Sequence, residues 1–180
     1  MKKVLLDASS AILLLKADLL AKLSDFYQVS QTQSVFFELT MEDRYGAGIF
    51  RQYTAEKKIK VTDVENGPRP AKTCDQSLHS LDQGELDTIR SFKAGKHDFI
   101  IIDDGPAAKY CYKNNIDFIN ALLFPRVLFF SNNISLDECN GYMDELVRYG
   151  RYSDEVIAWA NNCQRESLLF AIPANCGIDM

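Results

Sequence analysis

Four apolar residues in a row, Phe99 to Ile102, end in two adjacent aspartates, Asp103 and Asp104. An apolar run without alternation fits a central parallel strand that is buried on both faces. Two adjacent carboxylates repel each other at the end of such a strand unless a cation neutralises them. This segment therefore predicts a parallel sheet in an α/β fold, with a functional acid at the end of the strand.

The rest of the chain alternates short apolar runs with longer helical patterns. We predict further strands at residues 4–6, 26–29, 59–64 and 116–119, the third of them an exposed edge strand because its apolar and polar residues alternate. Helices are predicted at about residues 11–23, 34–39, 49–57, 81–93, 106–114, 121–130, 136–149 and 153–161. Strands that alternate with helices indicate α/β layers around a mostly parallel sheet.

Length and composition fit one globular domain over residues 1–180, with a tail at 165–180 whose structure the sequence leaves open. The net charge of −5 argues against broad electrostatic attraction to nucleic acid, although a cluster of metal-binding acids would itself supply several negative charges. The five cysteines form no Cys-x-x-Cys motif, which favours free thiols in a reducing cytoplasm. No run of about 18 apolar residues occurs, so no membrane span is predicted.

Three further acids stand near the ends of predicted elements. Asp7 follows the strand at 4–6, Glu38 lies in the helix at 34–39, and Glu85 follows Gly84 near a helix start. In α/β folds ligands bind at the carboxyl ends of the strands, where we expect these acids to meet Asp103 and Asp104. Mg²⁺ prefers oxygen ligands, and such an ion can polarise a phosphoryl oxygen and activate water. The five acids therefore predict a divalent-metal site.

Each acid also has a purely structural interpretation. Asp7 is at a common helix-capping position, but Ser9 or Ser10 could cap that helix instead and leave Asp7 free. Ser9 could also hold a carboxylate or a metal-coordinated water. Glu38 could be a surface residue of an amphipathic helix, and Glu85 could serve the helix dipole.

Other catalytic motifs are missing, and the basic patches are small. His79 and His97 are isolated, and neither a Gly-x-Ser-x-Gly elbow nor a phosphate-binding loop occurs. Arg148 and Arg151 form a basic patch that suits a solvated face or contact with an RNA backbone. Four tyrosines are available for base stacking, although packing is their commoner role: Tyr45, Tyr110, Tyr149 and Tyr152.

The order and context of the acids resemble the PIN domain. The motifs that carry the resemblance are Val4-Leu5-Leu6-Asp7-Ala8-Ser9-Ser10, Ser34-Val35-Phe36-Phe37-Glu38-Leu39, Leu81-Asp82-Gln83-Gly84-Glu85-Leu86-Asp87-Thr88-Ile89 and Ile100-Ile101-Ile102-Asp103-Asp104-Gly105-Pro106-Ala107-Ala108-Lys109. The Gly-Glu helix start and the strand that ends in Asp-Asp are similar to a prokaryotic VapC-like branch. The resemblance extends from residue 4 to about 160.

The resemblance implies a three-layer α/β/α sandwich and a ribonuclease that depends on Mg²⁺ or Mn²⁺. It implies that Asp7, Glu38, Glu85 and either Asp103 or Asp104 bind the metal, and it leaves the choice within the pair open. VapC-like members are toxins that cleave RNA, are held by a small antitoxin protein and often form homodimers. Gly105-Pro106 and the tail at 165–180 depart from that pattern.

The sequence also allows two functions other than a metal-dependent ribonuclease. A phosphatase could use Asp7 as its nucleophile, but that chemistry wants a second acid two residues later, where this chain has Ser9. A non-catalytic module with the PIN fold could bind RNA or a protein without cleaving it.

Overall fold

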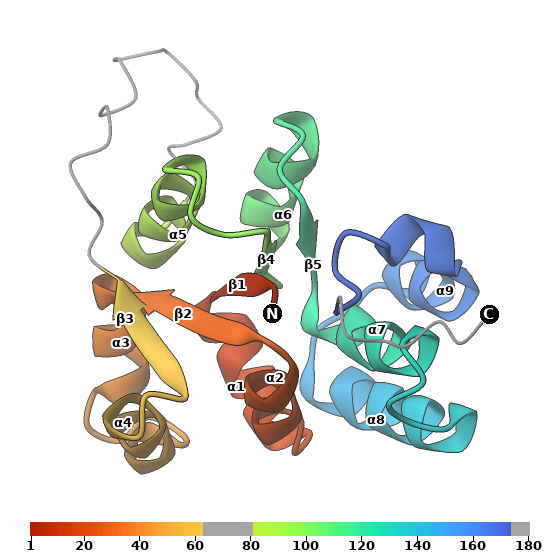
Figure 1. The fold of residues 1–180 in the computed structure, drawn as a ribbon, viewed down its shortest axis with the longest axis horizontal. Helices are drawn as coiled ribbons and strands as arrows, with labels where there is room; N and C mark the ends of the chain where they lie inside the picture. Colours follow the sequence, from red (N-terminus) through yellow and green to blue (C-terminus); the bar gives the residue numbers. More distant parts are fainter. Residues whose placement is uncertain (63–80, 174–180) are drawn as a thin grey trace.

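The computed structural model describes residues 1–62 and 81–173, and in this part of the chain five parallel strands form one sheet (Figure 1). The strands are β1 (Lys3–Leu6), β2 (Gln28–Thr32), β3 (Ile59–Thr62), β4 (Phe99–Ile101) and β5 (Phe118–Ile119). Their order across the sheet is β3-β2-β1-β4-β5, which puts β1 at the centre and β3 at one edge, as predicted. The predicted α/β fold with a parallel sheet is confirmed.

The register of the sheet aligns the ends of its inner strands. Val4 of β1 pairs with Val29 of β2 and with Phe99 of β4. The backbone N–H of Asp7 donates to the carbonyl of Ile101 at 3.1 Å. The residues that directly follow β1 and β4 therefore leave the sheet side by side.

Helices cover both faces of the sheet. They are α1 (Ala8–Lys16), α2 (Leu20–Phe26), α3 (Gln33–Thr40), α4 (Ala47–Ala55), α5 (Gln83–Lys93), α6 (Gly105–Lys113), α7 (Phe124–Phe130), α8 (Leu136–Tyr149) and α9 (Asp154–Asn162), with 3₁₀ turns at Ala121–Leu123 (η2) and Arg165–Leu168 (η3). In Figure 1, α5 and α6 lie above the sheet and α1, α2, α7 and α8 lie below it. The three-layer α/β/α arrangement is confirmed.

Alternate residues of the inner strands supply the two halves of the core. Leu5 and Ile100 pack with residues of α5 and α6 in one buried cluster. Val4, Leu6 and Ile101 point the other way and pack with α1, α2, α7 and α8. Both faces of β1 and β4 are buried, which explains why these strands read as continuous apolar runs.

Several predicted boundaries near the first helices are wrong. The helix predicted at 11–23 is two helices, because Asp18 takes a left-handed conformation with φ of 56° between α1 and α2. The strand predicted at 26–29 begins only at Gln28, since Phe26 ends α2. The helix predicted at 34–39 begins at Gln33, because Thr32 caps it by accepting a hydrogen bond from the N–H of Val35 at 3.3 Å.

The described part of the tail closes the amino-terminal end of the sheet. Leu168 and Ala171 are buried, and the hydroxyl of Tyr27 donates to the carbonyl of Ala171 at 2.7 Å. The side chain of Lys2 donates to the carbonyls of Leu169 and Phe170. Residues 165–173 are therefore part of the folded structure.

Three cysteines, Cys111, Cys139 and Cys163, are buried free thiols, as the sequence predicted. Cys74, Cys176 and His79 lie outside the described residues, as do positions 63–64 of the predicted edge strand. Among the helices of the described ranges, none combines the length and the apolar character that a bilayer crossing needs.

Candidate active site

A cavity of about 470 Å³ opens at the carboxyl ends of β1 and β4. Six carboxylates line it: Asp7, Glu38, Asp82, Glu85, Asp103 and Asp104. The structure thus brings all five predicted acids to one cavity, which we call the acid pocket, although their role as metal ligands stays a prediction. Asp82 is an additional acid of the pocket that was not predicted as a site residue.

Asp7 lies at the start of the pocket, between β1 and α1. Its Oδ2 accepts hydrogen bonds from the N–H of Ser9 at 3.1 Å and from the hydroxyl of Ser9 at 2.6 Å. Asp7 is therefore itself the N-cap of α1, and the prediction that a serine would cap this helix is wrong. Both Ser9 contacts use one oxygen, so Oδ1 receives no side-chain hydrogen bond from the described residues.

Burial makes the charge of Asp7 costly. The residue is 4% exposed, and this desolvation raises the pKa of its carboxyl to about 6 against the partial offset of the Ser9 hydrogen bonds. A carboxylate in this position is a group that a cation would stabilise.

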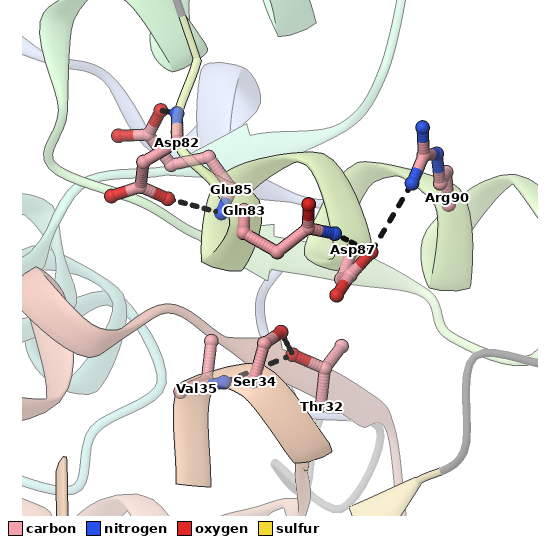
Figure 2. Close-up of polar contacts among 8 residues, drawn as sticks. All are labelled: Thr32, Ser34, Val35, Asp82, Gln83, Glu85, Asp87 and Arg90. Carbon is pink, nitrogen blue, oxygen red and sulfur yellow. Dashed lines mark hydrogen bonds and ion pairs between the residues drawn. The ribbon is translucent and has the colours of Figure 1, made fainter. Parts of the chain in front are cut away.

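Glu85 and Asp82 form a capping box at the start of α5 (Figure 2). The N–H of Glu85 donates to Asp82 Oδ1 at 2.9 Å, and the N–H of Asp82 donates to Glu85 Oε2 at 2.9 Å. Burial is the main cause that raises the pKa of Glu85 to about 8, with further contributions from the charges of Asp104, Asp82 and Asp7. These acids are therefore close enough to repel one another.

Asp87 lies on the outer side of the same helix. It accepts hydrogen bonds from Arg90 at 3.3 Å and from Gln83 at 2.7 Å, as Figure 2 shows. It does not line the acid pocket. On an ideal helix a residue two positions after Glu85 points away from it, and the geometry agrees.

Glu38 reaches the pocket from α3, which packs beside the start of α5. A side-chain carbon added at Gly84 would lie 3.6 Å from Glu38 Oε2 and 3.3 Å from Asp82 Oδ1. Gly84 thus lies between Asp82 and Glu38, at the point where the start of α5 meets α3. The other oxygen of Glu38, Oε1, lies 3.5 Å from Arg44 in a partly exposed ion pair.

Asp103 and Asp104 are adjacent in sequence but differ in their surroundings. Asp103 Oδ2 accepts from the hydroxyl of Ser10 at 2.7 Å and from the N–H of Ala121 at 2.9 Å, and Oδ1 accepts from the hydroxyl of Tyr152 at 2.5 Å. Asp104 Oδ1 caps α6 through the N–H of Ala107 at 3.1 Å. Asp103 thus has both oxygens engaged, while Asp104 keeps Oδ2 without a hydrogen bond from the described residues.

The oxygen donors of the pocket are of the type that a divalent metal ion prefers, but their arrangement is not that of a ready ligand set. Within residues 1–62 and 81–173, no three His, Cys, Asp or Glu side chains are arranged so that they could hold an ion as they stand. The pocket nevertheless gathers carboxylates that each engage only one oxygen with the protein, such as Asp104 and Glu85. Hard divalent cations bind oxygen and keep several waters, so this donor set fits a hydrated Mg²⁺ or Mn²⁺ ion.

The sequence named Ser10, Arg151 and Tyr152 for other roles, as a helix cap, a basic patch and a stacking or packing residue, and missed how they surround the acids. Ser10 and Tyr152 hold Asp103, and Gly150 and Arg151 line the pocket beside Tyr152. A serine two or three residues after a strand-end aspartate is a usable signal for Ser10. Tyr152 carries no comparable signal, because it reaches Asp103 from 49 residues further along the chain.

Comparison with known proteins identifies the fold family. A family model described as a PIN domain matches residues 3–162. No curated protein and no solved structure matches the chain. PIN domains are generally nucleases that act on RNA and typically use divalent metal ions. With the match extending over most of its length, the chain belongs to the PIN domain family.

Proposed function

We propose that this protein is a metal-dependent ribonuclease that hydrolyses RNA phosphodiester bonds with the help of Mg²⁺ or Mn²⁺. The observation that carries the proposal is the convergence of six carboxylates in one cavity, where burial and mutual repulsion raise the pKa of Asp7 and of Glu85. A carboxylate cluster with shifted pKa values in a cleft is a strong candidate for a functional site.

We assign metal binding to Asp7, Glu38, Glu85 and Asp104. Each lines the pocket, and the capping hydrogen bonds of Asp7, Glu85 and Asp104 each use one carboxylate oxygen. A bound divalent ion would supply phosphoryl polarisation and a water of lowered pKa. The protein's part is to fix these acids in place: the capping bonds orient Asp7 and Asp104, and the capping box orients Glu85.

Asp103 takes a different role in this proposal. Three protein donors occupy its two oxygens, so it has little capacity left for a metal. We therefore assign Asp104 as the ligand of the pair and Asp103 as a structural residue that joins α1, η2 and Tyr152. This assignment narrows the choice that the sequence left open.

The decisive experiment measures cleavage of a single-stranded RNA with Mn²⁺ and with EDTA. We expect cleavage only with Mn²⁺, and a loss of at least about a hundredfold in Asp104→Asn, since asparagine can still cap α6 but binds a cation poorly. Asp87→Asn is the matched control, because Asp87 is an acid of α5 that pairs with Arg90 outside the pocket. Full activity in Asp104→Asn or in EDTA would overturn the assignment.

A VapC-like toxin role extends the same proposal, with a small antitoxin and a second copy of the chain as partners in the cytoplasm. Two exposed apolar side chains support a protein partner: Phe37 of α3 is 62% exposed, and Met41, which directly follows that helix, is 57% exposed. Buried free thiols fit a reducing compartment. Expression of the wild type should arrest bacterial growth, Asp7→Asn should not, and the neighbouring upstream gene should relieve the arrest.

One observation favours a second candidate, a PIN-fold module that binds RNA or a protein without cleaving it. In the described part of the chain no ready-made ligand set exists, so the acids would have to move to hold an ion directly. A thermal-shift titration with Mn²⁺ separates the two candidates. Stabilisation by Mn²⁺ that Asp7→Asn abolishes supports the nuclease, whereas RNA binding without any response to Mn²⁺ supports the module.

A further inference from the structure

The connection between α8 and α9 forms one wall of the acid pocket. Tyr149, Gly150, Arg151 and Tyr152 all line the cavity, and we call these four residues the arm. Arg151 is exposed, and in the described structure it has neither an ion pair nor a hydrogen bond. A cation that faces carboxylates without pairing with them is available to a ligand of opposite charge.

Tyr152 anchors the arm to the base of the pocket. Its hydroxyl donates to Asp103 Oδ1 at 2.5 Å, and Asp103 is also held by Ser10 of α1 and by Ala121 of η2. Burial, followed by the neighbouring charge of Asp103, raises the pKa of Tyr152, so its hydroxyl stays protonated and donates at neutral pH. Asp103 is thus the point where α1, η2 and the arm are tied together.

Gly150 makes this anchor sterically possible. A side-chain carbon added there would lie 2.3 Å and 2.9 Å from ring atoms of Tyr152 and 3.0 Å from the carbonyl oxygen of Leu146. The glycine is needed for space, because its φ of −90° is open to any residue. The ring of Tyr152 therefore folds back over the backbone at Gly150 to reach Asp103.

Lys16 supports the opposite side of the arm. Its ammonium nitrogen lies 5.7 Å from the ring centre of Tyr149 and 5.3 Å from that of Tyr45. Lys16 lines the acid pocket and, among the residues that the structure describes, has no ion pair. Arg44 is different, since its guanidinium lies 3.5 Å from Glu38. Lys16 and Arg151 are thus two cations at the pocket whose charge the described acids leave unpaired.

We propose that Tyr152 is a positioning residue that, through Asp103, holds the arm so that Arg151 binds a backbone phosphate of the RNA next to the acid pocket. The inference rests on the proposed ribonuclease function and deepens it. A guanidinium donates charge-assisted hydrogen bonds to phosphate oxygens in a fixed planar geometry, which suits a residue that sets substrate register. Asp103 then serves the reaction indirectly, through the arm.

The test measures binding of a short fluorescein-labelled single-stranded RNA by anisotropy, in an Asp7→Asn background that keeps the RNA intact. Arg151→Ala should weaken binding about tenfold and reduce the salt slope of log K by about 0.7, the value for one single-strand phosphate. Tyr152→Phe, which removes only the hydroxyl, should weaken binding severalfold. The double variant should bind no worse than Arg151→Ala, because both changes remove the same contact.

A matched control is Arg148→Ala, since Arg148 is a cation of the same helix that pairs with Glu145 at 3.1 Å and lies outside the pocket. Its binding should be unchanged. In the active protein, Tyr152→Phe should raise KM while kcat stays within about twofold, a split that loss of stability alone does not produce. Gly150→Ala should have the effect of Tyr152→Phe, because its new carbon displaces the ring.

The outcomes separate the inference from the function on which it rests. RNA binding by the parent that is indifferent to Arg151→Ala and Tyr152→Phe overturns the inference alone. Equal losses in Arg148→Ala and Arg151→Ala, or additive losses in the double variant, also overturn it. If the Asp7→Asn parent does not bind RNA and the wild-type protein does not cleave it, the proposed function is overturned, and the inference falls with it.

Discussion

The two ends of the sheet differ in whether their polar groups have partners within the protein. At the amino-terminal end, Lys2 donates to the carbonyls of Leu169 and Phe170, and Tyr27 donates to Ala171. At the carboxyl end, Asp7 and Glu85 are buried beside other acids, and their pKa values are raised. The same strands therefore run from a closed end, where partners satisfy polar groups, to an acid pocket, where charge is left uncompensated.

This difference separates stability from function. Groups that find partners inside the chain stabilise the fold, whereas buried acids without cationic partners destabilise it unless a ligand binds. The presence of several such acids in one cavity therefore indicates a site that binds a cation. Substitutions at either end of the sheet test this comparison.

The largest expected effect comes from removing one charge: at the carboxyl end of the sheet this should lower activity, and at the amino-terminal end it should lower stability. Asp7→Asn should lower RNA cleavage at least about a hundredfold, yet leave the free energy of unfolding at pH 8 equal or higher, because a buried charge is removed while the cap is kept. Lys2→Met should lower stability by about 1–3 kcal/mol and leave kcat unchanged. Paired kinetic and urea-unfolding measurements check both, and a stability loss in Asp7→Asn equal to that in Lys2→Met would contradict the comparison.

The next effect is a pH dependence of stability in the metal-free protein. A carboxyl whose pKa is higher in the folded chain binds more protons when folded, so stability falls as pH rises from the unfolded pKa to the folded one. That window runs from 3.8 to about 6 for Asp7 and from 4.5 to about 8 for Glu85. The loss from Asp7 alone is about 3 kcal/mol, since one pKa unit is about 1.4 kcal/mol. Thermal melts in EDTA over the whole window, from pH 3.8 to about 8, measure it.

Mn²⁺ should reverse this loss at pH 8, because the cation compensates the ionised acids. A melting temperature that rises with pH in EDTA would show that the acids are already compensated within the protein. The same melts on Asp7→Asn serve as the control, since this variant should lose the part of the pH dependence that belongs to Asp7.

A smaller effect is expected from Tyr27→Phe at the closed end. The variant keeps the ring, which packs edge-on against Phe99 with the ring centres 5.5 Å apart. It removes the hydroxyl that donates to the carbonyl of Ala171. Leaving that buried carbonyl unsatisfied should cost about 1–3 kcal/mol in urea unfolding. RNA cleavage should be unchanged, so a loss of kcat would show that the two ends are coupled.

The smallest effect is expected from Arg44→Ala at the rim of the acid pocket. The Arg44 and Glu38 side chains are 47% and 33% exposed in their 3.5 Å ion pair, so stability should change by less than about 1 kcal/mol. The Mn²⁺-induced thermal shift should persist, because Glu38 keeps its carboxylate. Loss of that shift would assign Arg44 a part in organising the site.

Local signals in the sequence predicted much of the fold. The apolar run before Asp103 predicted an interior parallel strand, and the helical pattern at 136–149 predicted α8 at its observed bounds, Leu136–Tyr149. Predictions failed where two caps competed over a few residues. Asp7 caps α1 where a serine was expected, and Thr32 caps α3 so that this helix begins at Gln33, one residue before its predicted start.

The sequence predicted five of the six acids that line the pocket, but it did not distinguish their surroundings. Asp7, Glu38, Glu85 and the aspartate pair could be found because strand ends and helix starts are visible in a sequence. The distinction between Asp103 and Asp104 could not, because the donors to Asp103 come from 93, 18 and 49 residues away. Contacts over such separations leave no local pattern.

By itself, the sequence determined the α/β layers, the parallel sheet and the set of acids at its carboxyl end, since all of these follow from apolar periodicity and from which residues end each strand. Only the tertiary structure decided which acid is held by the protein and which keeps a free oxygen, and which cations face the pocket unpaired. Hydrogen bonding and desolvation depend on neighbours in space, and folding brings those neighbours together from distant parts of the chain.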